Sequence, residues 1–173
     1  MESINLVKRI TRNAIYLAIL CAVGMFALPL GDNIKVSLQL LVVFIIGLTV
    51  NSFVDSLIIT GLYLLLGLFF PIYAGFSASI TPTFGYVISF VVISIPLYFL
   101  NKLKINNQFV RMGLACFISL LIVYTIGTIF LMLYLNIAIE KALLFSVVPY
   151  LPFDIAKIVI AVLVVSILEK RKQ

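Results

Sequence analysis

The chain has 173 residues, of which 64% are hydrophobic and 10% are charged, with a net charge of +6 and a mean hydropathy of +1.29. This composition excludes an ordinary soluble globular domain and indicates an integral membrane protein. Apolar segments of about 17 to 25 residues recur along the whole chain, so we expect one membrane-embedded domain over residues 1–173.

Six apolar segments, separated by Pro, Gly, Asn and charged residues, predict an all-α fold of six transmembrane helices. In chain order they cover residues 10–29, 37–50, 54–70, 84–101, 108–136 and 150–169. The first segment is longer than the apolar region of a signal peptide and lacks a small-residue cleavage pattern, so we expect it to be retained. An even number of spans places both termini on the same side of the membrane.

The distribution of basic residues predicts which side that is. Nine of the 12 Lys and Arg residues precede the first span, lie between the fourth and fifth, or follow the sixth. They are Lys8, Arg9, Arg12, Lys102, Lys104, Arg111, Lys170, Arg171 and Lys172. By the positive-inside rule this face is cytoplasmic, and so are both termini. The net charge then reflects orientation and attraction to anionic membrane lipid, and we expect no nucleic-acid partner.

The residue types argue against metal and enzymatic chemistry. The chain has no histidine, and Cys21 and Cys116 stand alone in apolar segments without a CxxC motif. We therefore expect no zinc or other metal site, no disulfide framework and no histidine-based catalysis. The sequence also contains no GxxxxGK[ST] motif, so it does not form the phosphate-binding loop of a P-loop ATPase.

Two ionisable residues interrupt the last apolar segment, in the sequence PFDIAK at 152–157. Asp154 and Lys157 are three residues apart and share one helix face, and the predicted orientation places them near the outer surface. They form either a self-contained ion pair near the lipid headgroups or part of a polar cavity in the bundle. In the second case, carboxylate and ammonium suit a small ligand that carries both N–H donors and oxygen acceptors.

Other polar residues fall in the same outer half of the membrane. Gln39 lies at the start of the second span, and the linker FFPIYAGFSASITPTFGY covers residues 69–86 without a charge. This linker either covers a cavity with its aromatic rings or simply connects two spans, with its tyrosines at the membrane interface. Its candidate binding residues are Tyr73, Ser77, Phe84 and Tyr86.

The first span carries a stripe of small residues. Ala14, Ala18 and Ala22 recur every four residues, and such a stripe allows another helix to approach closely. That helix belongs either to this chain or to a partner.

Four motifs, in this order and spacing, resemble the BioY family, the biotin-specific substrate-binding (S) components of energy-coupling-factor (ECF) transporters. VSLQ at 36–39 is similar to the family's Val-Thr-Leu-Gln, and LYLLLGLFFPIYAG at 62–75 follows it. TPTFGY at 81–86 is similar to Gly-Pro-Thr-Gly-Gly-Tyr, and PFDIAK at 152–157 to Pro-x-Asp-x-x-Lys.

This resemblance implies a six-helix fold with both ends inside and high-affinity capture of extracellular biotin in the plasma membrane of a prokaryote. It implies no cofactor of the chain's own and no enzymatic activity, because a transmembrane coupling subunit and two ATPases supply the energy. It also implies that the loaded subunit topples in the membrane and that Ala14, Ala18 and Ala22 dock on the coupling subunit.

Three departures from the family pattern keep other substrates open. The linker between the third and fourth spans is shorter, Phe84 replaces a glycine, and Val87 stands where some members have arginine. If Lys157 alone binds the ligand's carboxylate, lipoate or another ring-bearing acid is an alternative to biotin. A structural membrane subunit that binds no small molecule is the alternative from another class.

Overall fold

The computed structural model describes residues 2–29 and 35–170. Within these ranges it contains seven α-helices and one two-stranded hairpin. They are α1 (Glu2–Met25), β1 (Ala27–Pro29), β2 (Lys35–Ser37), α2 (Gln39–Thr49), α3 (Phe53–Phe69), α4 (Phe84–Leu100), α5 (Gln108–Leu135), α6 (Ile139–Ser146) and α7 (Leu151–Lys170). The predicted all-α class is therefore confirmed, with the hairpin as an addition.

Each of the six predicted segments coincides with one helix. Five of them, α2 to α5 and α7, begin and end within two residues of the predicted positions. α1 differs more, because it begins at Glu2 and ends at Met25 instead of covering 10–29. Residues 2–9 are too polar to count as part of an apolar segment, but they contain no Gly or Pro to end a helix.

Two helices, α5 and α7, are long and apolar enough to cross a membrane. The apolar helices α2, α3 and α4 are shorter, with 11, 17 and 17 residues. The count of six spans therefore stays a prediction.

Three elements, β1, β2 and α6, lie in segments that the sequence predicted as loops or as the ends of spans. Strands β1 and β2 pair antiparallel, with Leu28 opposite Val36. α6 occupies the connection between α5 and α7, where it buries Ala142 and Ser146 and exposes Leu143, Leu144 and Phe145. A helix of eight residues that buries only one narrow face gives a weak periodic signal, which explains why the sequence analysis missed it.

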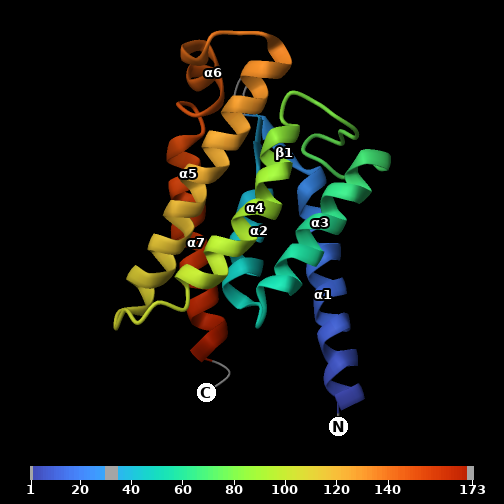
Figure 1. Ribbon diagram of the computed structural model, residues 1–173, viewed down its shortest axis with the longest axis vertical. Helices are drawn as coiled ribbons and strands as arrows, with labels where there is room; N and C mark the ends of the chain where they lie inside the picture. Colours follow the sequence, from blue (N-terminus) through green and yellow to red (C-terminus); the bar gives the residue numbers. More distant parts are fainter. Residues whose placement is uncertain (1, 30–34, 171–173) are drawn as a thin grey trace.

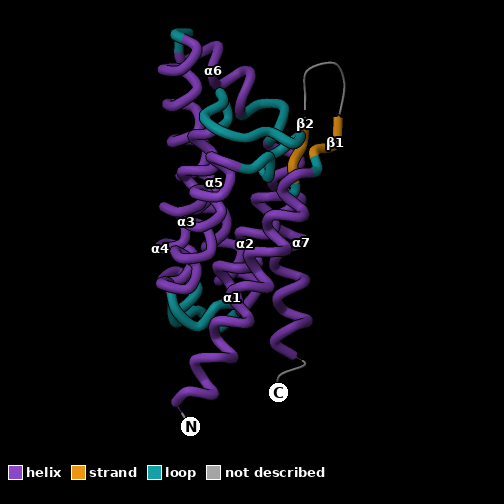
Figure 2. Tube along the Cα trace, turned by 90° about the vertical axis from the view of Figure 1, so that its right-hand side faces the viewer, coloured by secondary structure: helices purple, strands orange, loops and turns teal. Residues whose placement is uncertain are grey.

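The helices form an elongated bundle with two distinct ends (Figure 1). The hairpin and α6 lie at one end, and the start of α1, the end of α7 and the α4–α5 loop lie at the other (Figures 1 and 2). The structure thus gathers the described basic residues of these three segments at one end, whereas Lys141 of α6 is at the opposite end. Arg171 and Lys172 lie outside the described residues.

Close packing of apolar and small polar side chains holds the bundle together. α4 packs between α3 and α5, α2 packs against α7, and α1 packs against α3. Between α3 and α4, the Ser94 hydroxyl lies 3.0 Å from that of Ser56 and 3.2 Å from that of Thr60. Because lipid tails are as apolar as the core, such packing and hydrogen bonds are what favour helix association in a membrane.

Gly127 on α5 makes room for an aromatic side chain of α4. A Cβ atom at Gly127 would overlap the ring of Tyr86, whereas a Cβ atom at Gly113 of the same helix would meet nothing within 4 Å. The first position therefore requires glycine for packing and the second does not.

We predict that Gly127→Ala lowers the free energy of unfolding by about 1 to 3 kcal/mol, because the tyrosine ring must move. The matched variant Gly113→Ala should leave it unchanged or raise it by up to about 1 kcal/mol, since alanine favours helix. Unfolding of the purified protein in detergent, followed by circular dichroism, measures both. Equal losses in the two variants would contradict this packing.

Candidate functional site

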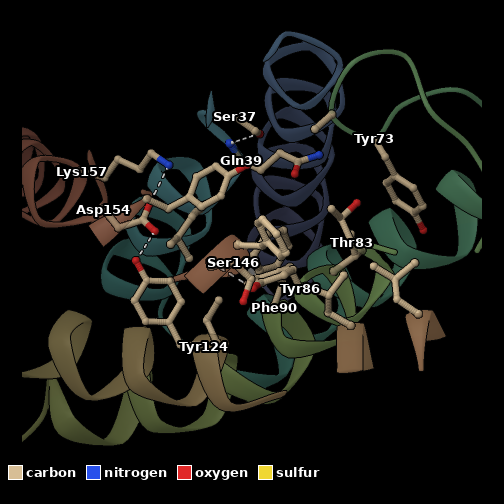
Figure 3. Close-up of a pocket in the computed structure, with 18 residues that line it drawn as sticks. Ser37, Gln39, Tyr73, Thr83, Tyr86, Phe90, Tyr124, Ser146, Asp154 and Lys157 are labelled. Atoms are coloured by element: carbon tan, nitrogen blue, oxygen red, sulfur yellow. Dashed lines mark hydrogen bonds and ion pairs between the residues drawn. The ribbon is translucent and has the colours of Figure 1, made fainter. Parts of the chain in front are cut away.

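A cavity of about 310 Å³ opens inside the bundle, and residues of β2 and α6 form part of its wall. Its size lies at the lower end of the range for small-molecule pockets. Five of the predicted binding residues line it, namely Gln39, Tyr73, Tyr86, Asp154 and Lys157. Figure 3 shows the charged pair on one side of the cavity and Tyr73 on the other.

The charged pair lies in the first two turns of α7, in the interior of the bundle. Asp154 and Lys157 are 5% and 6% exposed. The Lys157 Nζ donates to Asp154 Oδ1 at 2.7 Å, and the Tyr124 hydroxyl donates to Oδ2 at 2.7 Å. The two predicted alternatives are thus combined, because the residues pair with each other and also line a cavity. Neutralisation within the pair is what allows both ions to be buried.

Tyr124 is the most informative residue that the sequence analysis missed. It lies on α5, which packs against α7, and its phenol holds the second carboxylate oxygen of Asp154 in place. With one donor on each oxygen, the carboxylate still has lone pairs for a ligand. A tyrosine within the apolar segment 108–136 was the only available signal, and sequence alone does not show which helix it faces.

Gln39 begins α2 and is held by neighbouring helices. Its side-chain nitrogen donates to the carbonyl of Gly24 on α1, at 3.3 Å, and to the hydroxyl of Tyr63 on α3. The Tyr63 hydroxyl donates in turn to the carbonyl of Ile72 in the linker, at 2.9 Å. These bonds connect the cavity wall to α1, to α3 and to the linker.

Tyr73 closes the cavity from the linker. Its hydroxyl donates to the carbonyl of Leu64 at 2.5 Å, and its ring packs edge-on against Tyr63, 5.6 Å away between centroids. Burial raises the pKa of Tyr73 to about 12, so the phenol stays protonated and remains a donor at neutral pH. A Cβ atom at Gly67 would overlap this ring, so the glycine makes room for it.

Two predicted residues do not line the cavity. Phe84 packs behind Tyr73, between it and Phe130, with centroid distances of 6.1 and 6.0 Å. Ser77 pairs with Tyr73 through backbone hydrogen bonds, and its hydroxyl donates to the carbonyl of Ala74 at 3.0 Å. Both residues therefore support the linker, and their proximity in the sequence to cavity-lining residues explains their selection.

The remaining wall is mostly apolar and comes from several helices. Tyr86 of α4 donates to the carbonyl of Ser146 on α6 at 3.3 Å, so α6 is fastened to the cavity. Lining residues that the sequence analysis did not name as site residues include Ser37, Thr83, Phe90, Tyr124, Phe145, Ser146 and Tyr150. Among the described lining residues, Asp154 and Lys157 are the ones that carry charge.

The small-residue stripe lies on the surface of the protein, and the described residues contain no cluster of metal ligands. Ala14, Ala18 and Ala22 are exposed on α1. In residues 2–29 and 35–170, no three His, Cys, Asp or Glu side chains come together as metal ligands.

Comparison with known proteins gives consistent results. The sequence model of the BioY family matches residues 1–173. The chain is 26% identical over 168 residues to a Thermotoga maritima (strain MSB8) protein named biotin transporter BioY, covering 94% of this chain and 96% of that protein. It is 27% identical over 166 residues to a Pyrococcus horikoshii (strain OT-3) protein named probable biotin transporter BioY, with the same coverage.

A solved structure is similar over the whole chain. It is the crystal structure of the S-component for biotin from an ECF-type ABC transporter, with a TM-score of 0.86 and 26% sequence identity. The similarity covers 100% of this chain and 95% of the solved chain.

The ion pair predicts a non-additive response to substitution. Lys157→Met should lower the free energy of unfolding by about 3 kcal/mol or more, because it leaves a buried carboxylate without a counter-ion. The double variant Asp154→Asn with Lys157→Met should lose less than the single one, since no ion remains buried. Unfolding in detergent measures both, and a double variant that loses more than Lys157→Met alone would argue against this pairing.

Proposed function

The chain belongs to the BioY family, and from this premise we propose that it captures biotin in the cavity and is the biotin S component of an ECF-type ABC transporter. The proposal is supported by the two relatives named biotin transporters and by the similarity to a biotin S-component over the full chain. The single observation that carries it is the buried cluster of Asp154, Lys157 and Tyr124 on the cavity wall.

The cluster matches the ureido ring of biotin better than it matches a carboxylate. The ureido group offers two N–H donors and one carbonyl, and it carries no charge. Asp154 has free lone pairs for an N–H group, and Lys157 has further N–H donors for the carbonyl. A carboxylate bound to Lys157 would instead approach the carboxylate of Asp154, which lies 2.7 Å from the ammonium, and the like charges would repel.

The rest of the cavity suits the apolar part of biotin. Phe90, Val123 and Leu131 supply apolar surface, and Val87 stands in the wall where some family members have arginine. The acid end of the ligand then lies away from the charged pair. A buried polar group left without a partner costs about 1 to 3 kcal/mol, so a ligand that satisfies the cluster gains specificity.

Lipoate is the second candidate, and one observation favours it. Lys157 is the one cation among the described residues that line the cavity, so a ligand whose only polar group is a carboxylate has a single place to bind. Its dithiolane ring offers no N–H donor to Asp154, and biotin therefore remains first.

The proposed transporter places six spans in the plasma membrane of a prokaryote, in a single domain over residues 1–173 with both termini in the cytoplasm. The basic end of the bundle supports this orientation, and it places the cavity near the outer surface. The chain has no P-loop motif, and the proposal assigns the energy supply to a transmembrane coupling subunit and two ATPases, as the family resemblance implies. The exposed stripe of Ala14, Ala18 and Ala22 is the proposed docking surface for the coupling subunit.

Biotin binding tests the site directly. Titration of the purified protein should give tight biotin binding and much weaker lipoate binding. Asp154→Asn and Lys157→Met should each weaken biotin binding by about 10- to 100-fold, because each removes a hydrogen bond to a charged group. Glu140→Gln and Lys141→Met make the same chemical changes at exposed positions of α6 and should leave the affinity unchanged.

Other outcomes would decide against parts of this proposal. Preferential lipoate binding that depends on Lys157 alone would keep the transporter and change the substrate. Binding of neither compound by folded protein would favour the structural-subunit alternative. If a single variant is too unstable to assay, the double variant of Asp154 and Lys157 should fold and still fail to bind biotin.

A substitution in the small-residue stripe should impair assembly with the coupling subunit and leave biotin binding unchanged. Ala18→Leu places a branched side chain on the small-residue stripe, so it should abolish co-purification with the coupling subunit while biotin affinity stays unchanged. Ala156→Leu, an exposed position on α7, is the matched control and should retain co-purification. Retained assembly of Ala18→Leu would show that the coupling subunit docks elsewhere.

A further inference from the structure

A second hollow lies at the end of the bundle opposite to the cavity. It is a groove of about 430 Å³ between residues 6–17 of α1 and residues 55–62 of α3. Its walls are mainly apolar and are formed by Leu6, Ile10, Leu17, Ile58, Ile59 and Leu62. Four of these side chains, Leu6, Ile10, Ile58 and Leu62, are exposed, and a groove with such walls in a membrane accommodates an acyl chain.

The groove has a charged end that the proposed transport function does not use. Asp55 is 1% exposed and accepts hydrogen bonds from Arg9 Nε at 2.6 Å, Asn13 Nδ2 at 2.8 Å and Arg12 at 3.1 Å. Two guanidinium groups thus surround one carboxylate, which leaves one positive charge in excess.

Hydrogen-bonding capacity also remains unused at this end. The buried Nε of Arg12 has no acceptor, and the buried Oδ1 of Asn13 has no donor, among the described residues. Arg9 is bound to Asp55 through Nε, and its side chain is 46% exposed. Buried polar groups usually have a partner, so this end calls for a ligand that both accepts and donates.

We propose that the groove binds one anionic phospholipid of the inner leaflet. Its phosphate accepts hydrogen bonds from Arg9 and Arg12, and a hydroxyl of a glycerol headgroup donates to Asn13. One acyl chain lies along Ile58 and Leu62. Leu62 is seven residues beyond Asp55 on α3, about 10 Å deeper at the helical rise, which matches a chain that descends from a headgroup.

The position of the groove fits this occupant. The basic end of the bundle faces the cytoplasmic leaflet in the proposed orientation, and basic pockets between helices on that side bind anionic headgroups. Ala14 lines the groove and also belongs to the small-residue stripe. The bound lipid therefore lies at the edge of the proposed docking surface.

The absence of tryptophan from the chain gives a direct test. Leu62→Trp introduces a single tryptophan into the groove wall, and phospholipids brominated on the acyl chain quench its fluorescence on contact. In vesicles, brominated phosphatidylglycerol should reach half-maximal quenching at an at least about fivefold lower mole fraction than brominated phosphatidylcholine. Ile160→Trp, at an exposed position of α7 outside the groove, should show no headgroup preference.

Charge variants in the Leu62→Trp background complete the test. Arg12→Gln and Arg9→Gln should each reduce the preference, and each leaves one arginine on Asp55, so the protein should fold. Arg111→Gln removes a basic residue of α5 that contacts Asn101 and should keep the preference. These readouts are independent of biotin.

Four results would overturn the proposal. The first is equal quenching by the two lipids, and the second is a preference that survives in both arginine variants. The third is displacement by inorganic phosphate at matched ionic strength, which would identify a site for a free anion. Shielding of the reporter from both lipids in a chain that elutes as a dimer would likewise show that protein covers the groove.

Discussion

Every polar group inside a membrane protein must find its partner in the protein or in a ligand, because lipid tails offer none. The pair of Asp154 and Lys157 meets this constraint through mutual neutralisation and through Tyr124. The arrangement requires α5 and α7 to pack closely. It places one negative and one positive side chain, with no net charge, on the wall of the cavity. This part of the cavity wall therefore presents hydrogen-bond donors and acceptors without a net charge.

The same constraint explains the hydrogen bonds that join the cavity wall to several helices and to the linker. Gln39 reaches Gly24 and Tyr63, and Tyr63 reaches Ile72. Because one amide and one phenol satisfy carbonyls at a helix end and in the linker, four segments are held around the cavity before any ligand arrives. Such a preformed pocket loses less conformational entropy on binding than a flexible one does.

Most of the helices and several of the residues that line the cavity could be predicted from the sequence, for identifiable reasons. Helices α2 to α5 and α7 were predicted because continuous apolar segments between polar breaks are a strong signal. Five residues that line the cavity were selected because polar or aromatic residues near such segments stand out, and their contact with a ligand stays a prediction. They are Gln39, Tyr73, Tyr86, Asp154 and Lys157. Tyr124 and Ser146 were missed because their role depends on which way a helix faces. Phe84 and Ser77 were also selected as binding residues but do not line the cavity, since position along the chain does not show which side of a linker faces it. The hairpin and α6 were missed because they are too short to give a recognisable hydrophobic pattern.

α1 serves two separate regions of the molecule. Its last turn contacts the cavity network through Gly24, while Ala14 and Ala18 face outward nearer its start. Because no side chain of that outward stripe lines the described cavity, mutations that reshape the pocket leave the stripe intact. If the stripe docks on the coupling subunit as proposed, substitutions in the cavity wall can alter ligand choice while the docking surface keeps its side chains.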